Sequence, residues 1–94
     1  MNVLDSFQLN GRRALITGSS AGIGLALAEA LAQAGAHVVL NGRTASKVDA
    51  AAGTLRAQGF SVSTSVFDVT DADRVREAVD QIEAEGPIDI LVNN

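Results

Sequence analysis

Apolar residues occur along the chain in short blocks, and the lengths of these blocks predict four strands. Three runs have an apolar centre and are too short for helices, as is typical of buried strands: 13–17, 37–41 and 89–92. Residues 60–67 differ, because Val62, Thr64 and Val66 alternate with serines. This period of two predicts a strand with one polar face, less fully covered than the others.

The segments between these strands carry apolar residues at helical spacing and predict three helices. The first segment, 22–34, is rich in alanine and leucine, which favour helix. Its polar residues Glu29 and Gln33 share one narrow face, so we expect this helix to be buried on most sides. Gly35 is placed to end it in the left-handed conformation.

Polar residues and glycines mark the ends of the other two helices. Thr44 is placed as an N-cap for the second helix, and Gly59 follows its last turn. Thr70, with Asp73 three positions on, is a partial capping signal for the third helix, which Gly86 ends. Each helix thus lies between two of the predicted strands.

Strands and helices alternate in the order βαβαβαβ, which predicts an α/β fold with a parallel sheet. Right-handed crossovers would place helices on both faces, and doubly wound topology gives the strand order 3-2-1-4. The apolar strand 89–92 would then lie at an open edge, where it favours aggregation. We therefore expect residues 1–94 to form the N-terminal part of a single Rossmann-type domain, incomplete by itself.

Composition and charge exclude several classes of function. The 94 residues contain no cysteine, which excludes disulfides, iron–sulfur clusters and thiolate zinc sites. Aromatic residues make up 3% of the chain and the net charge is −4, so we expect no nucleic-acid-binding surface. His37 is the only histidine and has no evident partner, so we expect it to be structural and expect no metal site.

The sequence contains no signal for a membrane or for secretion. No apolar run reaches the roughly 20 residues that are needed to span a bilayer. The stretch 1–10 lacks a basic segment, and Asp5 interrupts its apolar character, unlike a signal peptide. We therefore expect a cytoplasmic protein with no membrane partner.

The stretch TGSSAGIG places three glycines between the first strand and the first helix. Gly18 can turn the chain tightly, while Gly22 and Gly24 allow the backbone to approach a ligand or another element closely. The free N–H groups at a helix start favour an anion such as pyrophosphate, and Ser19 and Ser20 can add hydroxyl donors. This context favours a phosphate site over the alternative, a tight turn without a ligand.

Three motifs, in this order, resemble the short-chain dehydrogenase/reductase family in its classical form. They are TGSSAGIG after the first strand, Asp68-Val69 after the third and Asn93-Asn94 after the fourth. The resemblance covers all 94 residues. Within the family, the stretches QLNGRRALITGSS and VVLNGR are similar to gluconate 5-dehydrogenases and to 3-oxoacyl-carrier-protein reductases.

The resemblance implies that these motifs bind a nicotinamide dinucleotide. The pyrophosphate and the adjoining ribose would be surrounded by four residues of the glycine loop: Gly18, Ser20, Ile23 and Gly24. Asp68 would accept the adenine amino group with Val69 beside the ring, unless Asp68 is only a polar residue that ends a strand. Asn93 and Asn94 would steady the central sheet, line the ribose-nicotinamide side, or do both.

The end of the second strand distinguishes the two forms of the cofactor. A carboxylate there accepts hydrogen bonds from a free ribose 2′-hydroxyl. From the second strand onward, however, the first acidic residue is Asp49, which lies inside the next helix. Asn41 can hydrogen-bond either form of the ribose, and the planar cation of Arg43 suits a 2′-phosphate. These residues favour NADP(H) over NAD. The alternative is that the protein uses both cofactors and that Arg43 is a solvated residue at the start of a helix.

The catalytic residues that the resemblance implies do not occur among these 94 residues. Hydride transfer in the family relies on a Tyr-x-x-x-Lys pair and a preceding serine, yet the sequence has no tyrosine, and its single lysine is Lys47. We expect the catalytic residues to lie beyond Asn94 and this chain alone to be inactive. The complete protein would be a homo-oligomer, a tetramer by resemblance, that interconverts a ketone and a secondary alcohol on a small molecule such as a sugar acid. The alternative is a non-catalytic half-domain that binds nucleotide weakly or serves in folding or assembly.

Overall fold

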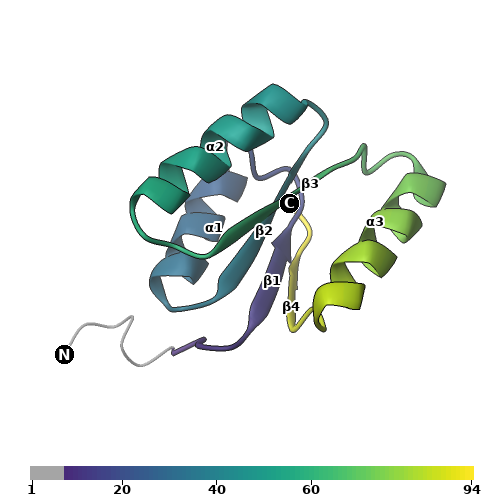
Figure 1. Ribbon diagram of the computed structural model, residues 1–94. Coiled ribbons are helices and arrows are strands. Elements are labelled where there is room, and N and C mark those ends of the chain that lie inside the picture. The colour runs from purple at the N-terminus through teal and green to yellow at the C-terminus, as the bar shows by residue number, and fades with distance from the viewer. Residues whose placement is uncertain (1–7) are drawn as a thin grey trace.

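A computed structural model of the chain describes residues 8–94, so residues 1–7, which make up most of the segment compared above with a signal peptide, lie outside it. Strands and helices alternate throughout the described residues, as the pattern predicts (Figure 1). The elements are β1 (Arg13–Ile16), α1 (Gly22–Gln33), β2 (His37–Gly42), α2 (Ala45–Ala57), β3 (Val62–Val66), α3 (Ala72–Glu85) and β4 (Ile90–Val92).

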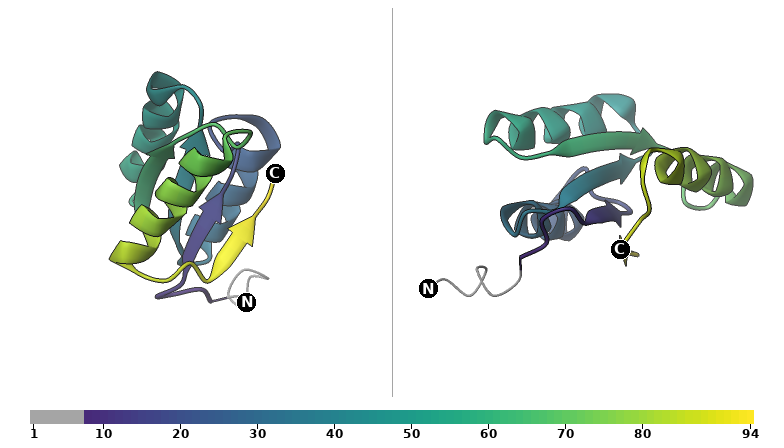
Figure 2. Two further views of the ribbon diagram at one scale, coloured as in Figure 1. Left: turned by 90° about the vertical axis from the view of Figure 1, so that its right-hand side faces the viewer. Right: turned by 60° about the horizontal axis from the view of Figure 1, so that its bottom comes forward.

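The four strands form one parallel sheet in the order β3-β2-β1-β4, which confirms the predicted doubly wound order. Leu15 of β1 pairs with Val39 of β2 on one side and with Leu91 of β4 on the other. Helices α1 and α2 cover one face of the sheet, and α3 lies on the other (Figure 2). Because all strands run the same way, their carboxyl ends meet at one edge, where the loops to the helices begin.

The core is divided between the two faces of the sheet. Alternate residues of the central strands, such as Ile16 and Leu40, pack with α1 and α2 in the larger cluster. The residues between them, Leu15 and Val39, face α3 and meet Ile82 in a smaller cluster. Since both faces of β1 and β2 are covered, these strands are apolar throughout rather than alternating.

Helix α1 is less buried than its sequence predicts. Only Gly24, Ala28 and Ala32 are buried, while Ile23 is 75% exposed and Leu27 is also exposed. The expectation of burial on most sides was therefore wrong for the described residues. The reason is that the small residues face β1 and β2, while no other element of residues 8–94 covers the opposite side.

The helix ends agree with the pattern in position but not always in their contacts. Gly35 has a φ of 104° and ends α1 in the predicted left-handed conformation. Thr44 occupies the N-cap position of α2, but its side chain makes no capping hydrogen bond. The N-cap of α3 is Asp71, which accepts a hydrogen bond of 3.2 Å from the backbone N–H of Arg74, in place of the predicted Thr70.

The edge strands are the least covered, as expected. In β3 only Val62 is buried, and Val66, predicted to share its face, is exposed. Leu91 of β4 is 63% exposed. An edge strand has a neighbour on one side only, so its side chains keep part of their contact with solvent.

Glycine permits the close contact between α1 and the loop that precedes it. A Cβ built on Gly24 would collide with the carbonyl oxygen of Gly18 and lie 2.8 Å from Nδ2 of Asn94. Gly53, in the middle of α2, is exposed, and a Cβ there would meet nothing within 4 Å. Gly24 and Gly53 therefore have opposite physical settings.

The same substitution at these glycines should change stability in opposite directions. We expect Gly24→Ala to lower the free energy of unfolding by about 1–3 kcal/mol, since the backbone must shift to admit the methyl group. Gly53→Ala should raise it by roughly 0.5–1 kcal/mol through helix propensity. Urea denaturation of both variants measures the difference, and a stabilised Gly24→Ala protein would contradict the close packing.

His37 lies at the start of β2 and, contrary to expectation, has partners. Its Nδ1 is hydrogen-bonded to the hydroxyl of Ser61 and its Nε2 to that of Ser63, the latter at 2.7 Å. Burial, followed by the positive charge of Arg13, lowers the pKa of the imidazole below 6.5, against the opposing effect of Glu85. A structural role agrees with these contacts.

The lowered pKa of His37 should make stability depend on pH. The folded state holds fewer protons on His37 than the unfolded state does, so the free energy of unfolding should fall as the pH drops below about 6.5. His37→Gln retains a donor and an acceptor but does not titrate, so it should remove this part of the dependence. Denaturation between pH 5 and pH 8 measures it; identical profiles for the two proteins would refute the expectation.

Candidate functional site

A groove opens at the carboxyl ends of β1, β2 and β3, where the sheet meets its loops. Its volume is about 340 Å³, and it is lined in part by the glycine loop and by the segment after β3. It brings together seven of the residues predicted from the sequence: Gly18, Ser20, Asn41, Arg43, Asp68, Val69 and Asn94. Ligands of open parallel sheets bind at this edge, next to the reversal of strand order.

Three predicted residues do not line this groove. Gly24 lies behind the loop, against Gly18. Ile23 is exposed at the start of α1. Asn93 lines a separate hollow on the α3 side of the sheet, beside Leu15 and Val79.

The glycine loop has the backbone conformation that its glycines predict. Gly18 and Gly22 have positive φ angles of 58° and 62°, which residues with side chains rarely adopt. A Cβ on Gly22 would meet nothing within 4 Å, so this residue serves the turn rather than a close contact. Ala21 is the N-cap of α1 and provides no side-chain cap. The first N–H groups of α1 are therefore without a side-chain acceptor, which favours an anion.

The two serines of the loop have different roles. Ser19 is fully buried, and its hydroxyl donates to the carbonyl of Ile16 at 2.7 Å and accepts from the N–H of Asn41 at 2.8 Å. The expectation that Ser19 adds a donor for a ligand is therefore corrected, because its single hydrogen is used inside the protein. Ser20 is the serine that lines the groove.

Asn41 faces inward rather than toward solvent. It is 1% exposed, and its Oδ1 accepts from the N–H of Gly18 at 3.0 Å. Both hydrogens of its amide are used, because Nδ2 donates to the carbonyls of Ser65 and Phe67, each at 3.1 Å. In this geometry both amide hydrogens of Asn41 are used inside the protein, so none is left to donate to a ribose.

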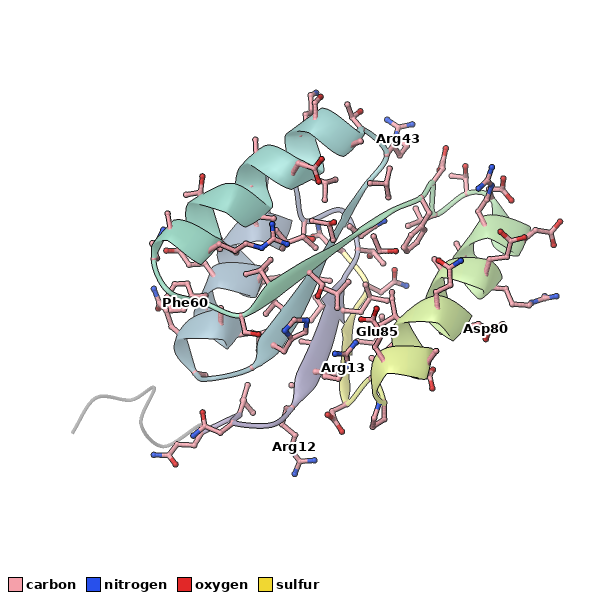
Figure 3. All side chains as sticks on the ribbon, viewed as in Figure 1. Arg12, Arg13, Arg43, Phe60, Asp80 and Glu85 are labelled. Atoms are coloured by element: carbon pink, nitrogen blue, oxygen red, sulfur yellow. The ribbon has the colours of Figure 1, made fainter. Side chains whose placement is uncertain are left out.

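The end of β2 has no room for an acidic side chain in place of Gly42. A Cβ on Gly42 would lie 2.8 Å from Val48 Cγ2 and 3.1 Å from the hydroxyl oxygen of Ser20. Arg43 follows directly, and its exposed side chain extends beyond the carboxyl end of the sheet (Figure 3). A hydroxyl and a guanidinium thus line the groove where the sequence carries no carboxylate, a combination that suits a phosphate group.

Asp68 forms a tight turn with Thr70 on the opposite side of the groove. Its Oδ1 accepts from the N–H of Thr70 at 2.9 Å and from the hydroxyl of Thr70 at 2.7 Å. These two hydrogen bonds, more than the charge of Arg43, lower the pKa of Asp68. The carboxylate is therefore ionised at neutral pH, and Oδ2 is the oxygen left to accept a hydrogen bond from an amino group.

Asn94 connects β4 to the glycine loop. Its side chain donates to the carbonyl of Gly18 at 3.1 Å, and its backbone N–H donates to the hydroxyl of Thr17 at 3.0 Å. Sequence reasoning did not assign roles to Thr17, Gly42 or Phe67, and it gave Thr70 only a role as a helix cap. For Thr17 a signal was present, since a hydroxyl at the end of a central strand can reach the neighbouring strand's end.

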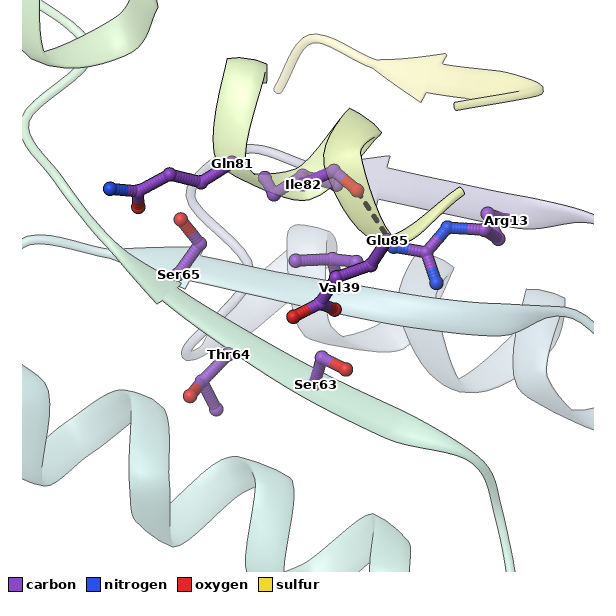
Figure 4. A pocket seen from close by; sticks show the side chains of 8 residues that line it. All are labelled: Arg13, Val39, Ser63, Thr64, Ser65, Gln81, Ile82 and Glu85. Atoms are coloured by element: carbon purple, nitrogen blue, oxygen red, sulfur yellow. Dashed lines mark hydrogen bonds between the residues drawn. The ribbon is translucent and has the colours of Figure 1, made fainter. Parts of the chain in front are cut away.

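A second, smaller cavity lies between β3 and α3 (Figure 4). Its volume is about 120 Å³, and Arg13, Ser63 and Glu85 contribute polar groups to its lining. The guanidinium of Arg13 donates to the carbonyl of Ile82, while its Nε is buried without a partner among the described residues. No predicted site residue lines this cavity.

Within 8–94, no three His, Asp or Glu side chains gather closely enough to hold a metal ion. No helix in this part of the chain is long and apolar enough to cross a membrane. The groove offers a hydroxyl, a cation and one ionised carboxylate, and it lies beside the start of α1, whose first N–H groups have no side-chain acceptor; together these can bind an anion with an attached amine.

Comparisons with known proteins agree with this arrangement. A gluconate 5-dehydrogenase of Gluconobacter oxydans (strain 621H) is 57% identical over 91 residues, which cover 96% of this chain and 36% of that protein. The crystal structure of a gluconate 5-dehydrogenase from Burkholderia cenocepacia J2315, in complex with NADP and tartrate, has a TM-score of 0.86 and 52% identity. It matches 96% of this chain and 36% of its own.

A third similar protein is a reductase. The crystal structure of a 3-oxoacyl (acyl-carrier-protein) reductase from Agrobacterium tumefaciens C58, with NADP bound, has a TM-score of 0.86 at 41% identity and matches 97% of this chain and 35% of that one. The chain thus spans about a third of the length of the relatives that it matches. The family model for short chain dehydrogenases matches residues 12–94, nearly the whole sequence, and this chain therefore belongs to the short-chain dehydrogenase family.

Proposed function

We propose that this chain forms the NADP(H)-binding part of an oxidoreductase of the gluconate 5-dehydrogenase type. The observation that carries the proposal is the end of β2, where Ser20 and Arg43 line the groove and the strand is followed by no carboxylate. Gly42 adds to it, because an acidic side chain there would collide with Val48 and Ser20. A 2′-phosphate thus finds a cation and a hydroxyl, whereas a free 2′-hydroxyl finds no carboxylate to accept its hydrogen.

The groove suggests where each part of the cofactor would bind. The loop from Gly18 to Gly24 would hold the pyrophosphate through the N–H groups at the start of α1, with Ile23 beside the adjoining ribose. Asp68 would accept a hydrogen bond from the adenine amino group, with the exposed Val69 against the ring. Asn94 would act mainly through the carbonyl of Gly18, and Asn93 would face the nicotinamide side.

The complete protein would oxidise a secondary alcohol or reduce a ketone, and the cofactor supplies or accepts the hydride. Relatives at 57% and 52% identity are gluconate 5-dehydrogenases, which supports a sugar acid as the substrate. The acid/base residues would lie in the two thirds of the relatives' length that this chain does not match. The complete protein would be a homo-oligomer that acts in the cytoplasm on a small molecule and binds neither nucleic acid nor a membrane.

The preference for NADPH should depend on Arg43. We expect Arg43→Ala to weaken NADPH binding by roughly tenfold or more, since a hydrogen bond to a charged group contributes about 1.5–3 kcal/mol. NADH binding should change little. Calorimetric titration of both cofactors measures the ratio, with Arg76→Ala, on α3 and outside the groove, as the matched control. Equal losses for NADPH and NADH would contradict a phosphate contact.

The activity is tested with the full-length protein and a panel of sugar acids. We expect reduction of NADP+ with gluconate and no activity from residues 1–94 alone, because the chain has no tyrosine to act as the acid/base. Binding of NADPH without activity on any ketone or alcohol by the full-length protein would favour the non-catalytic alternative instead.

A further inference from the structure

The groove has two walls, the glycine loop on one side and the end of β3 with the turn after it on the other. Among the described residues, 8–94, only the side chain of Asn41 forms hydrogen bonds to both walls. On one side it accepts from the N–H of Gly18, in the glycine loop. On the other side it donates to the carbonyls of Ser65 and Phe67, at the end of β3. Phe67 directly precedes Asp68, so a single amide links the predicted pyrophosphate wall to the predicted adenine wall.

The backbone of Asn41 strengthens the link to the loop. Its carbonyl accepts from the N–H of Ser19 at 2.8 Å, and its N–H donates to the hydroxyl of Ser19 at 2.8 Å. The same hydroxyl donates to the carbonyl of Ile16. The loop is thus held to β1 and β2 by buried hydrogen bonds, and the amide of Asn41 extends them to the end of β3, beside the backbone hydrogen bond of 3.2 Å from the N–H of Phe67 to the carbonyl of Gly42.

The hydrogen bond from Asn41 to Phe67 is buried, and those with Gly18 and Ser65 are partly buried. Asn41 is 1% exposed, so a side chain without an amide would leave the N–H of Gly18 and the carbonyl of Phe67 without their partner. Gly18 has a positive φ, which glycine adopts without strain but which its own conformational preference does not fix, so its hydrogen bond to Asn41 helps to set the position of the loop. Loss of the amide should therefore change the position of the loop and of the turn after β3 together.

We infer that Asn41 is a positioning residue that holds the two walls of the cofactor groove in register, without itself touching the cofactor. The inference rests on the proposed function, because the groove is taken to bind NADP(H). It assigns Asn41 an effect on affinity beyond its effect on folding. It also predicts that the two walls respond together when the amide is lost.

The first test uses amide hydrogen exchange in the full-length protein without cofactor. Asn41→Leu, of similar size, should speed exchange at the N–H of Gly18 and also at the N–H of Thr70, which is bonded to Asp68 on the other wall. The N–H of Val38, bonded to Ser61 at the far end of the sheet, is the internal reference and should be unchanged. Faster exchange at Gly18 alone would overturn the proposed link between the walls.

The second test measures NADP+ affinity by calorimetry. We expect Asn41→Leu to bind about tenfold more weakly or worse, since each backbone group left unsatisfied carries a desolvation cost of that order. The matched control is Val62→Ala, which removes buried apolar atoms at the start of β3 and should lower stability without changing affinity. If Asn41→Leu and Val62→Ala lose the same amount of NADP+ affinity, Asn41 has only a general structural role and the inference is wrong.

Asn41→Asp provides a third readout and a second variant if Asn41→Leu does not fold. A protonated carboxyl can still accept from Gly18 and donate one hydrogen to Phe67, whereas the ionised form sets negative oxygens against two carbonyls. Burial raises the pKa of such a group, so NADP+ affinity relative to the unsubstituted protein should recover several-fold between about pH 8 and about pH 6. A relative affinity that does not change with pH would overturn the assignment.

These readouts separate the inference from the proposed function. If the unsubstituted protein binds no NADP+, the proposed function fails, while exchange at Gly18 and Thr70 still decides whether Asn41 joins the walls. If NADP+ binds and exchange at both amides is unchanged in Asn41→Leu, the proposed function stands and the role of Asn41 is refuted.

Discussion

The contact between the start of α1 and the carbonyl of Gly18 is the constraint on which the rest of the site depends. Gly24 has no Cβ, so the helix can lie directly on the turn that leaves β1. This position points the first N–H groups of α1 toward the carboxyl edge of the sheet and lets Asn94 reach the same carbonyl. A larger residue at Gly24 would move the helix, and with it the donors that favour an anion.

Around this contact, polar residues at the strand ends divide into those that support the groove and those that face it. Ser19 and Asn41 are buried and use their hydrogens on backbone groups. Ser20, which directly follows Ser19, and Arg43, two residues after Asn41, line the groove. These residues lie where the strands pass into their loops, so short stretches of the chain contribute both to the buried framework and to the lining of the groove.

Much of the fold followed from local patterns in the sequence. The apolar runs and the helical spacing predicted the elements and the parallel order, because a two-sided parallel sheet needs strands that are apolar on both faces. The exposed side of α1 was not foreseen, since the composition of a helix does not reveal which neighbours it has. The cap of α3 moved from Thr70 to Asp71 because Thr70 is held by Asp68 instead.

The sequence by itself determined the order of the elements, the conformation of the glycine loop and the absence of a carboxylate after the second strand. Those features depend on residue type and spacing within a few positions of the chain. Only the tertiary structure decided that Asn41 points inward and that Gly42 is crowded by Ser20 and Val48. The direction of a side chain at a strand end depends on register with the neighbouring strands, which distant parts of the chain set together.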